Sequence, residues 1–276
     1  MSSENAEQAE FWNGRMGTAW VSVEDYIDRM MAPLSAVALD AVNAKPGDRI
    51  IDVGCGCGTT SFALGENGAA VWGVDISKKM IDRAKQKHNP ASNVDFSVSD
   101  AASQQYTPDH TVVFSRFGVM FFADPVKAFA NLRSALVPSG RLVFLCWQLP
   151  AANPWLSIAG AVLQPFQPAD APAPDPEAPG PFRFAVPDYT REVLGSAGFT
   201  NIAMQPVVKD LYMGATIDEL MRFQSNIGPL SGLLETLDKS RHPEATAAVR
   251  DAFSAKADSN GINLEASTWL VTATNG

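Results

Sequence analysis

The apolar residues of this chain form short runs that alternate with longer amphipathic stretches. Several runs are rich in β-branched and aromatic residues and end at Gly, Asp or Ser, which is typical of buried strands. The predicted strands are 49–53, 70–74, 94–98, 111–115 and 141–147. The predicted helices between them lie near 59–66, 77–88 and 125–136. Strands that alternate with helices indicate an α/β fold, with a parallel sheet and right-handed crossovers.

The N-terminal region is predicted to be helical. Its apolar residues recur at near-helical spacing over 4–44, and we expect breaks around Gly14 and Gly17. Proline fits the first turn of a helix, so we expect Pro33 to begin a separate helix that continues from Leu34 to Val42.

The strand–helix alternation stops after residue 147. Residues 150–187 hold ten of the nineteen prolines, which predicts a stiff loop with a short helix at 154–164 at most. Beyond it the pattern predicts a helix near 188–197, a strand at 200–208, helices over 215–258 with a break at Gly228-Pro229, and a last strand at 262–273.

These elements predict a core with two additions. The expected organisation is a helical cap at 1–44, an α/β core at 45–212 that includes the Pro-rich loop 150–187, a helical lid at 213–260, and the last core strand at 261–276.

The most informative motif lies at 48–58 and reads DRIIDVGCGCG. The strand 49–53 ends in glycines at alternate positions, where a backbone without Cβ atoms can turn sharply and approach a ligand: Gly54, Gly56 and Gly58. A strand that leads through such a loop into a helix is how α/β proteins bind nucleotide-like cofactors. The next strand ends at Asp75, where a carboxylate suits a pair of ribose hydroxyls.

The glycine spacing helps to decide which cofactor is bound. A dinucleotide fold carries G-x-G-x-x-G, whereas this chain carries G-x-G-x-G. Asp52 stands two residues before the first glycine, where a carboxylate would repel a pyrophosphate and favour a cationic ligand. Over Ile51 to Gly58 the chain resembles the class I S-adenosylmethionine (SAM) methyltransferases.

The resemblance implies a doubly wound, mostly parallel seven-stranded sheet of the Rossmann-like methyltransferase type, with the last strand antiparallel. It implies SAM as the cofactor and methyl transfer to a small molecule. It covers roughly residues 45–210, and within the family the core is most similar to the ubiquinone/menaquinone-biosynthesis-like subgroup. In the simplest members the last two strands form a hairpin, so residues 215–258 are interpreted as a helical insertion over the active site.

The resemblance also implies roles for individual residues. The glycine loop would approach the methionine moiety, Asp52 would favour the cationic portion, and Asp75 would bind the ribose. Ile76 and Met80 would pack on the adenine. The complete set of expected cofactor-binding residues is Asp52, Gly54, Cys55, Gly56, Gly58, Asp75, Ile76, Met80, Asp100, Ala101, Ser115, Arg116 and Phe117.

Several of these residues have simpler interpretations. The residues alone establish only that acids end three successive strands, at the edge of a parallel sheet where ligands bind. Asp75 and Asp100 are also common types at turns and helix N-caps. Met80 fits an ordinary helix core, and Arg116 fits an ion pair with a surface carboxylate.

Composition excludes several classes of partner. The net charge is −9, the pI is about 4.8 and no long basic run occurs, which argues against nucleic acid or an anionic membrane as partner. Apolar runs are too short for a membrane span. The odd set of cysteines, Cys55, Cys57 and Cys146, favours a reduced, cytoplasmic protein, and no zinc-type spacing accompanies them. The oligomeric state, including a homo-oligomer, stays open.

The acceptor side carries weaker signals. A cavity for a small, partly apolar acceptor is expected from lid residues Leu220, Met221, Phe223, Gln224, Asn226, Ile227, Leu230 and Leu233, with Phe121, Phe122, Trp147 and Trp155. The alternative is that these residues, like Trp12 and Trp20, only fill the core.

The catalytic residue stays unknown from the sequence. The three histidines, His88, His110 and His242, are expected to be structural or solvated, and Asp25, Tyr26 and Tyr189 have no supporting pattern as bases.

Two other functions stay open. A nicotinamide-dependent oxidoreductase is disfavoured by the glycine spacing, and no tyrosine has the Lys four residues later that many short-chain members carry. A protein that binds SAM without transferring a methyl group is the other alternative.

Overall fold

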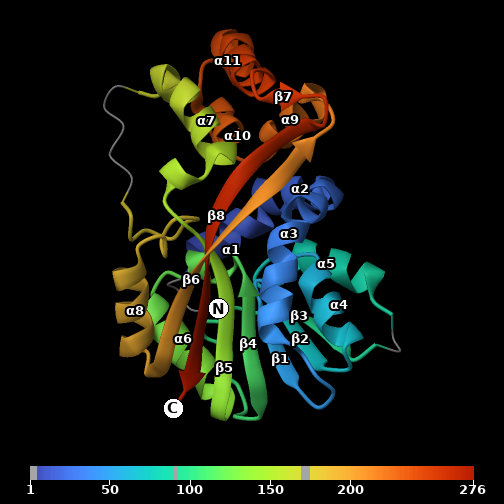
Figure 1. The fold of residues 1–276 in the computed structure, drawn as a ribbon, viewed down its shortest axis with the longest axis vertical. Coiled ribbons are helices and arrows are strands. Elements are labelled where there is room, and N and C mark those ends of the chain that lie inside the picture. Colours follow the sequence, from blue (N-terminus) through green and yellow to red (C-terminus); the bar gives the residue numbers. More distant parts are fainter. Residues whose placement is uncertain (1–4, 90–91, 169–174) are drawn as a thin grey trace.

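A central sheet organises the molecule, as the computed structural model shows for residues 5–89, 92–168 and 175–276 (Figure 1). The strand order is β3-β2-β1-β4-β5-β8-β6, with β7 pairing off this path with β8. The parallel strands are β1 (Arg49–Val53), β2 (Ala70–Asp75), β3 (Val94–Val98), β4 (His110–Arg116) and β5 (Leu136–Trp147). The predicted parallel α/β sheet is confirmed.

The last strand in the sequence is antiparallel, as the resemblance implied. β8 (Gly261–Asn275) lies between β5 and β6 (Phe199–Gly214) and pairs antiparallel with both. Both strands are longer than predicted, and the ends that extend beyond the core form a ribbon, with the short β7 (Ala257–Asp258) beside β8 (Figure 1). Exposed residues alternate along β6, so its burial signal is weak and its length could not be read from apolar runs.

The helices between the strands match their predicted positions closely. They are α4 (Thr59–Glu66), α5 (Lys78–Lys87), α6 (Pro125–Ser134) and α8 (Pro187–Ser196). The Ser77 hydroxyl accepts a hydrogen bond from the Met80 amide and caps α5, as expected for a serine N-cap. Asp124 caps α6 in the same way through the Lys127 amide.

The N-terminal helices differ from the prediction at two points. They are α1 (Ala6–Asn13), α2 (Arg15–Ser22) and α3 (Glu24–Val42). The predicted break at Gly14 is confirmed, but Gly17 lies inside α2, where a Cβ would come within 2.0 Å of the Trp12 carbonyl oxygen. This glycine permits close packing of α2 on α1 rather than a turn.

Pro33 does not begin a helix, so that prediction was wrong. It lies in the interior of α3, a helix of 19 residues. An interior proline removes one hydrogen bond of the helix. The long buried face of α3, which includes Ile27, Met30, Met31 and Leu34, stabilises the helix across that position.

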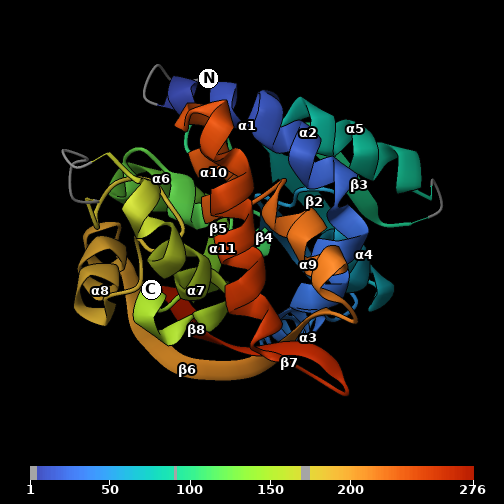
Figure 2. The same cartoon turned by 90° about the horizontal axis from the view of Figure 1, so that it is seen from above.

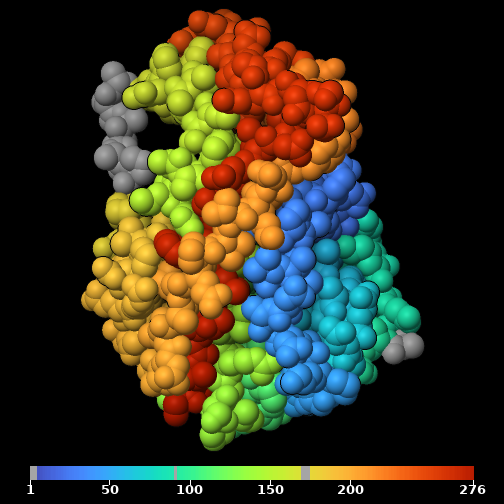
Figure 3. Space-filling model, viewed as in Figure 1, coloured from blue at the N-terminus to red at the C-terminus, as the bar shows by residue number. Residues whose placement is uncertain are grey.

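A group of helices lies beyond the carboxyl ends of the parallel strands, and we call it the lid. It consists of α7 (Pro154–Leu163), α9 (Ile217–Gln224), α10 (Pro229–Thr236) and α11 (His242–Ser254) (Figures 1 and 2). The predicted break at Gly228-Pro229 is confirmed, because α10 begins at Pro229. The space-filling view shows the lid packed against the ends of β6 and β8 (Figure 3).

The lid therefore contains more than the predicted insertion. Helix α7, from the Pro-rich stretch, packs against α10 and α11. The apolar composition of α7 was visible in the sequence. Its contact with α10 and α11 was not, because these helices lie roughly 75 and 90 residues later in the chain. The middle of the Pro-rich loop, residues 169–174, lies outside the described residues.

Candidate functional site

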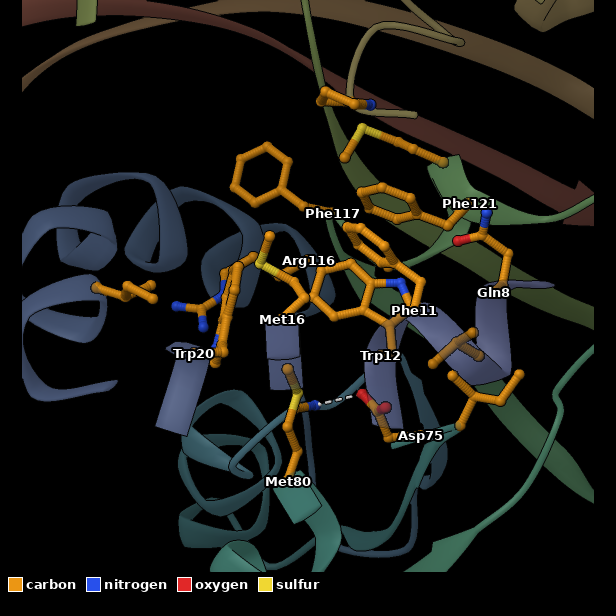
Figure 4. Close-up of a pocket in the computed structure, with 18 of the residues that line it drawn as sticks. Gln8, Phe11, Trp12, Met16, Trp20, Asp75, Met80, Arg116, Phe117 and Phe121 are labelled. Atoms are coloured by element: carbon orange, nitrogen blue, oxygen red, sulfur yellow. Dashed lines mark hydrogen bonds between the residues drawn. The ribbon is translucent and has the colours of Figure 1, made fainter. Parts of the chain in front are cut away.

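A cavity of about 340 Å³ lies at the carboxyl edge of the sheet, between the strand ends, the N-terminal helices and the lid. This is the edge at which ligands of open α/β sheets bind, and the volume suits a small-molecule site. In Figure 4 the side chains of Trp12, Met16 and Trp20 converge with those of Asp75 and Phe117 on the same space.

The glycine loop forms one side of this cavity. Gly54, Gly56 and Gly58 all have positive φ values, of 68°, 56° and 87°, which only glycine adopts readily. A Cβ on Gly54 would lie 2.7 Å from the Gly118 Cα, so the loop passes very close to the segment after β4. A Cβ on Gly56 would have more room, because the nearest atoms to it are Met80 Sδ at 3.8 Å and Trp20 Nε1 at 3.9 Å. Both of these residues line the cavity.

Asp75 joins the glycine loop to the end of β2. Its carboxylate accepts hydrogen bonds from the Gly56 amide at 2.9 Å, dashed in Figure 4, and from the Ser77 amide at 2.8 Å. Burial raises the pKa of Asp75 to about 6, and the nearby Asp52 carboxylate adds to the shift. Asp75 lines the cavity, and a carboxylate accepts up to about four hydrogen bonds, so a ligand's hydroxyl groups can also donate to it.

Asp100 lies where the sequence predicted, beyond the end of β3. Its carboxylate accepts hydrogen bonds from the Asn5 side-chain amide at 2.8 Å, the Ala102 amide at 3.0 Å and the Ser103 hydroxyl at 2.9 Å. Asp100 and its neighbour Ala101 both line the cavity.

Asp52 does not line the cavity, so it cannot touch a ligand there directly. It is fully buried behind the loop, where the hydroxyls of Thr60 and Ser61 in α4 donate to its Oδ2 atom at 2.8 and 2.6 Å. Burial raises the pKa of Asp52, and its Oδ1 atom has no hydrogen-bond partner among the described residues. This carboxylate holds the loop onto the start of α4.

Three further predicted residues lie behind the cavity wall rather than in it: Cys55, Gly58 and Ser115. A Cβ on Gly58 would lie 2.7 Å from the Phe96 ring, so this glycine allows a core contact. The Ser115 hydroxyl donates to the Val53 carbonyl at 2.7 Å and accepts from the Gly118 amide at 3.1 Å. It therefore fixes the segment after β4 to the end of β1.

The two residues after Ser115 both reach the cavity. Arg116 donates to the Ser35 hydroxyl at 2.7 Å and lies 3.5 Å from the Asp28 carboxylate. Phe117 has a positive φ of 67° and stacks on Trp147, with ring centroids 4.2 Å apart and planes 5° from parallel. A non-glycine residue with such a φ value is uncommon, and it aims this ring at the cavity.

The sequence reasoning missed the contribution of α1 and α2. Gln8, Phe11, Trp12, Met16 and Trp20, with Asn5 just before α1, line the cavity, whereas a place in the core was the favoured interpretation of Trp12 and Trp20. The spacing of Trp12, Met16 and Trp20, four residues apart, was the available signal. Three hydrogen bonds fix α1 to the β2–α5 junction: Asn13 to the Ile76 carbonyl, Lys78 amide to Asn13, and Ser77 hydroxyl to the Trp12 carbonyl.

The acceptor side of the cavity is aromatic and apolar. The predicted residues Phe121, Phe122, Trp147 and Trp155 line it. Of the predicted lid residues, Phe223 and Ile227 line it, while Leu220, Met221, Gln224, Asn226, Leu230 and Leu233 do not. Met30 and Met31 of α3 also reach it and were not predicted.

Among the described residues that line the cavity, the side chains with ionisable groups are Asp75, Asp100 and Arg116. The histidines and the three residues considered as bases, Asp25, Tyr26 and Tyr189, lie elsewhere. The Tyr26 hydroxyl donates to the Met213 carbonyl, and burial raises the pKa of Tyr26 well above its usual value.

The described ranges of the chain hold neither a cluster of metal ligands nor a membrane-spanning helix. They contain no group of three or more His, Cys, Asp or Glu side chains arranged to hold a metal ion. Each of their helices is too short or too polar to cross a lipid bilayer.

Comparison with known proteins agrees with this geometry. Residues 51–144 match a family model described as a methyltransferase domain. The chain is 26% identical over 207 residues to phosphoethanolamine N-methyltransferase 1 of Zea mays, a match that covers 74% of this chain and 38% of that protein. It is 29% identical over 136 residues to demethylmenaquinone methyltransferase of Renibacterium salmoninarum, covering 49% of this chain and 56% of that protein.

A solved structure shows the same fold. Phosphoethanolamine N-methyltransferase 2 of Haemonchus contortus, in complex with SAM, has a TM-score of 0.53 at 19% identity, covering 88% of this chain and 52% of that one. The chain spans less than two thirds of the length of the curated relatives named above. Residues 51–144 are similar to a methyltransferase domain, and the chain has the Rossmann-like fold of this solved methyltransferase.

Proposed function

We propose that this protein is an S-adenosylmethionine-dependent methyltransferase that acts on a small, partly apolar organic acceptor by in-line displacement. The observation that carries the proposal is the Asp75 carboxylate, which faces the cavity while it accepts a hydrogen bond from the Gly56 amide. This hydrogen bond places the carboxylate that would bind the ribose beside the glycine loop, on the same wall of the cavity. The methyltransferase-domain match supports the same conclusion.

The residues present fit a nucleoside with an amino-acid tail. Asp75 would bind the ribose, and Ile76 and Met80 would pack on the adenine. Asp100 and the Ala101 amide would bind the adenine edge. The Gln8 Oε1 atom is buried and has no partner among the described residues, so it offers a second acceptor for an amino group at the cavity wall.

The other end of the cofactor would lie along the glycine loop. Gly54 and Gly56 would allow close approach of the methionine moiety, and Arg116 would pair with its carboxylate. Cys55, Gly58 and Ser115 would support the loop from behind. Asp52 would act on a bound cation only through the electrostatic field, because it does not reach the cavity.

When bound, SAM would supply an activated methyl group on a sulfonium. The chain would hold the acceptor in line with it and exclude water, since the cavity is lined mainly by aromatic rings, thioethers and aliphatic groups.

Calorimetry with SAM and NADH tests the proposal against the oxidoreductase alternative. We expect saturable SAM binding by the wild-type protein and none with NADH. Asp75→Ala should weaken SAM binding by about 1.5–3 kcal/mol, the contribution of a hydrogen bond to a charged group. Tight NADH binding without SAM binding would overturn the proposal.

A second experiment separates methyl transfer from binding alone. Incubation with methyl-labelled SAM and a metabolite extract should move label onto a small molecule. If SAM binds but no acceptor gains label, the protein binds the cofactor for another purpose.

The proposal includes a cytoplasmic location, which is supported by the absence of disulfides at Cys55, Cys57 and Cys146. It also includes the division into a helical cap at 1–44, an α/β core at 45–212, a lid insertion at 213–260 and a last core strand at 261–276.

A further inference from the structure

Among the residues that the structure describes, the acceptor side of the cavity has no side chain suited to remove a proton. The ionisable lining residues of the described chain are Asp75, Asp100 and Arg116, and each is already engaged. Asp75 and Asp100 accept two or more hydrogen bonds each at the strand ends assigned to the nucleoside. Arg116 is a permanent cation bound to Ser35 and Asp28.

The same walls fit a flat, apolar molecule. Phe117 and Trp147 stack in parallel, and the Trp155 ring lies 4.9 Å from that of Trp147. Met30 and Met31 add thioether groups that adapt to an irregular shape. Planar aromatic bodies pack well on such rings, while a phosphorylated amine would need a cluster of cations that this wall does not supply.

We propose that the acceptor is a planar weak acid, such as a phenol, an enol or an aromatic thiol, which reacts as its conjugate base. The chain itself removes no proton. This inference rests on the proposed function and names the acceptor class for the same site.

Charge balance gives the physical reason. In the transfer, the acceptor's oxygen or sulfur lone pair forms a bond to the methyl carbon, the bond from that carbon to the sulfonium sulfur breaks, and its electron pair stays on the neutral thioether. The acceptor proton has already passed to water. A cation and an anion become two neutral molecules, a change that an apolar, low-dielectric cavity favours.

A protonated amine is the main competitor, because aromatic rings also attract cations. It would have to lose a proton inside the cavity, where the described walls offer no base, and methylation would leave a cation behind. Both requirements make a protonated amine fit the cavity less well than a weak acid. Transfer to amines is therefore one outcome that the test can detect.

The ionisation of a bound acceptor can be measured without turnover. We would titrate 4-nitrophenol, whose phenolate absorbs in the visible, with protein saturated with sinefungin, a cationic analogue that has no transferable methyl group. The matched complex contains the neutral product S-adenosylhomocysteine. An opposite charge within a few ångströms lowers the pKa of an acid by about one unit or more, so the ionisation constant should rise about tenfold or more with the cation present.

The matched variants test whether a protein group takes the proton. Tyr26→Phe removes the titratable group that stacks on the cavity residue Phe223, and His242→Gln removes a histidine of the lid. Neither should change the ionisation of the bound phenol. Loss of the phenolate signal in either variant, or equal ionisation in the two complexes, would overturn the proposal.

Turnover supplies the second test. Across nitro- and halogen-substituted phenols and thiophenols, the inflection of kcat/KM with pH should follow the pKa of each acceptor. One inflection shared by all acceptors, transfer to amines alone, or no transfer to any weak acid would contradict the proposal. Calorimetry with SAM separates these results from failure of the proposed function, because that failure would appear as absent cofactor binding.

Discussion

The raised pKa of Asp75 predicts that cofactor binding depends on pH. The pKa of Asp75 is raised to about 6 because the group is buried, so the carboxylate is ionised above that pH and protonated below it. Ribose hydroxyls donate to the ionised form, and a cationic ligand also prefers it. We therefore expect the affinity for SAM to fall as the pH is lowered through about 6, measured by calorimetry in a buffer series.

The control for this prediction is Asp75→Asn, which keeps the shape of the side chain and removes its titration. The variant should bind SAM more weakly at neutral pH, by about 1.5–3 kcal/mol, and with little dependence on pH between 5 and 8. A wild-type affinity that stays constant across this range would show that Asp75 does not contact the cofactor.

Gly56 and Gly58 form a matched pair for a second prediction. Both have positive φ, so an alanine at either site carries a similar backbone strain of about 1–2 kcal/mol. At Gly58 the added Cβ would also meet the Phe96 ring at 2.7 Å, whereas at Gly56 no heavy atom lies closer than 3.8 Å. Gly58→Ala should therefore lose about 1–3 kcal/mol more of the free energy of unfolding.

Binding should show the opposite order. Gly56→Ala places a methyl group where the cofactor would approach the backbone, so it should weaken SAM binding tenfold or more while the protein stays folded. Denaturant unfolding and calorimetry on both variants measure the two effects. Equal losses of stability and of affinity in the two variants would contradict the roles assigned here.

The sequence predicted these residues unequally well. The acids at the ends of β2 and β3 could be placed at the cavity because parallel strands end at one edge of the sheet. The position of Asp52 could not be predicted in this way, because it lies inside a buried strand. Its side chain is held away from the cavity by Thr60 and Ser61, which belong to the next helix.

At the scale of elements, hydrogen bonds attach α1 to the β2–α5 junction on the cofactor side of the cavity. The Asn13 side chain donates to the Ile76 carbonyl at 2.9 Å and accepts from the Lys78 amide at 2.9 Å. Asn13→Ala removes both bonds, so α1 should separate from α5 more often. We expect SAM binding to weaken by about 1–3 kcal/mol and limited proteolysis near residues 5–14 to accelerate.

Asp82→Ala is the control for the Asn13 variant. It removes an exposed ion pair to Lys78 in the same helix, and exposed pairs contribute little. It should leave both readouts close to wild type. If Asn13→Ala leaves SAM affinity unchanged, α1 does not form part of the cofactor site.

Elements were predicted well where local patterns decide them. The strands and helices of the core follow the apolar runs and the amphipathic spacing of the sequence. Pro33 shows the limit, because a local rule placed it at a helix start, whereas the tertiary packing of α3 overrides that rule. The length of β6 shows the same limit, since its outer half is stabilised by pairing with β8.

At the scale of the whole molecule, the cavity is made by segments that are far apart in sequence. Trp12 belongs to the cap, Asp75 and Phe117 lie at the ends of core strands, and Trp155 and Phe223 belong to lid helices α7 and α9. The resemblance predicted that the residues inserted before the last strand would cover the site. Which of their side chains face inward depends on how four helices pack, and a single sequence does not contain that information.

This construction leads to a prediction about global stability. A ligand that fills the cavity contacts the cap, the core and the lid together, so it should stabilise all three rather than one. Cofactor at 100 times its dissociation constant stabilises the folded protein by about 2.7 kcal/mol, which for a chain of this size raises the Tm by roughly 5–10 °C.

We expect SAM to give one sharper unfolding transition in calorimetry and to slow proteolysis of both α1 and α11. Asp75→Asn should reduce these effects and NADH should not produce them. Protection of the core alone, with α1 and α11 cleaved at the same rate with and without SAM, would mean that the cap and lid do not close on the cofactor.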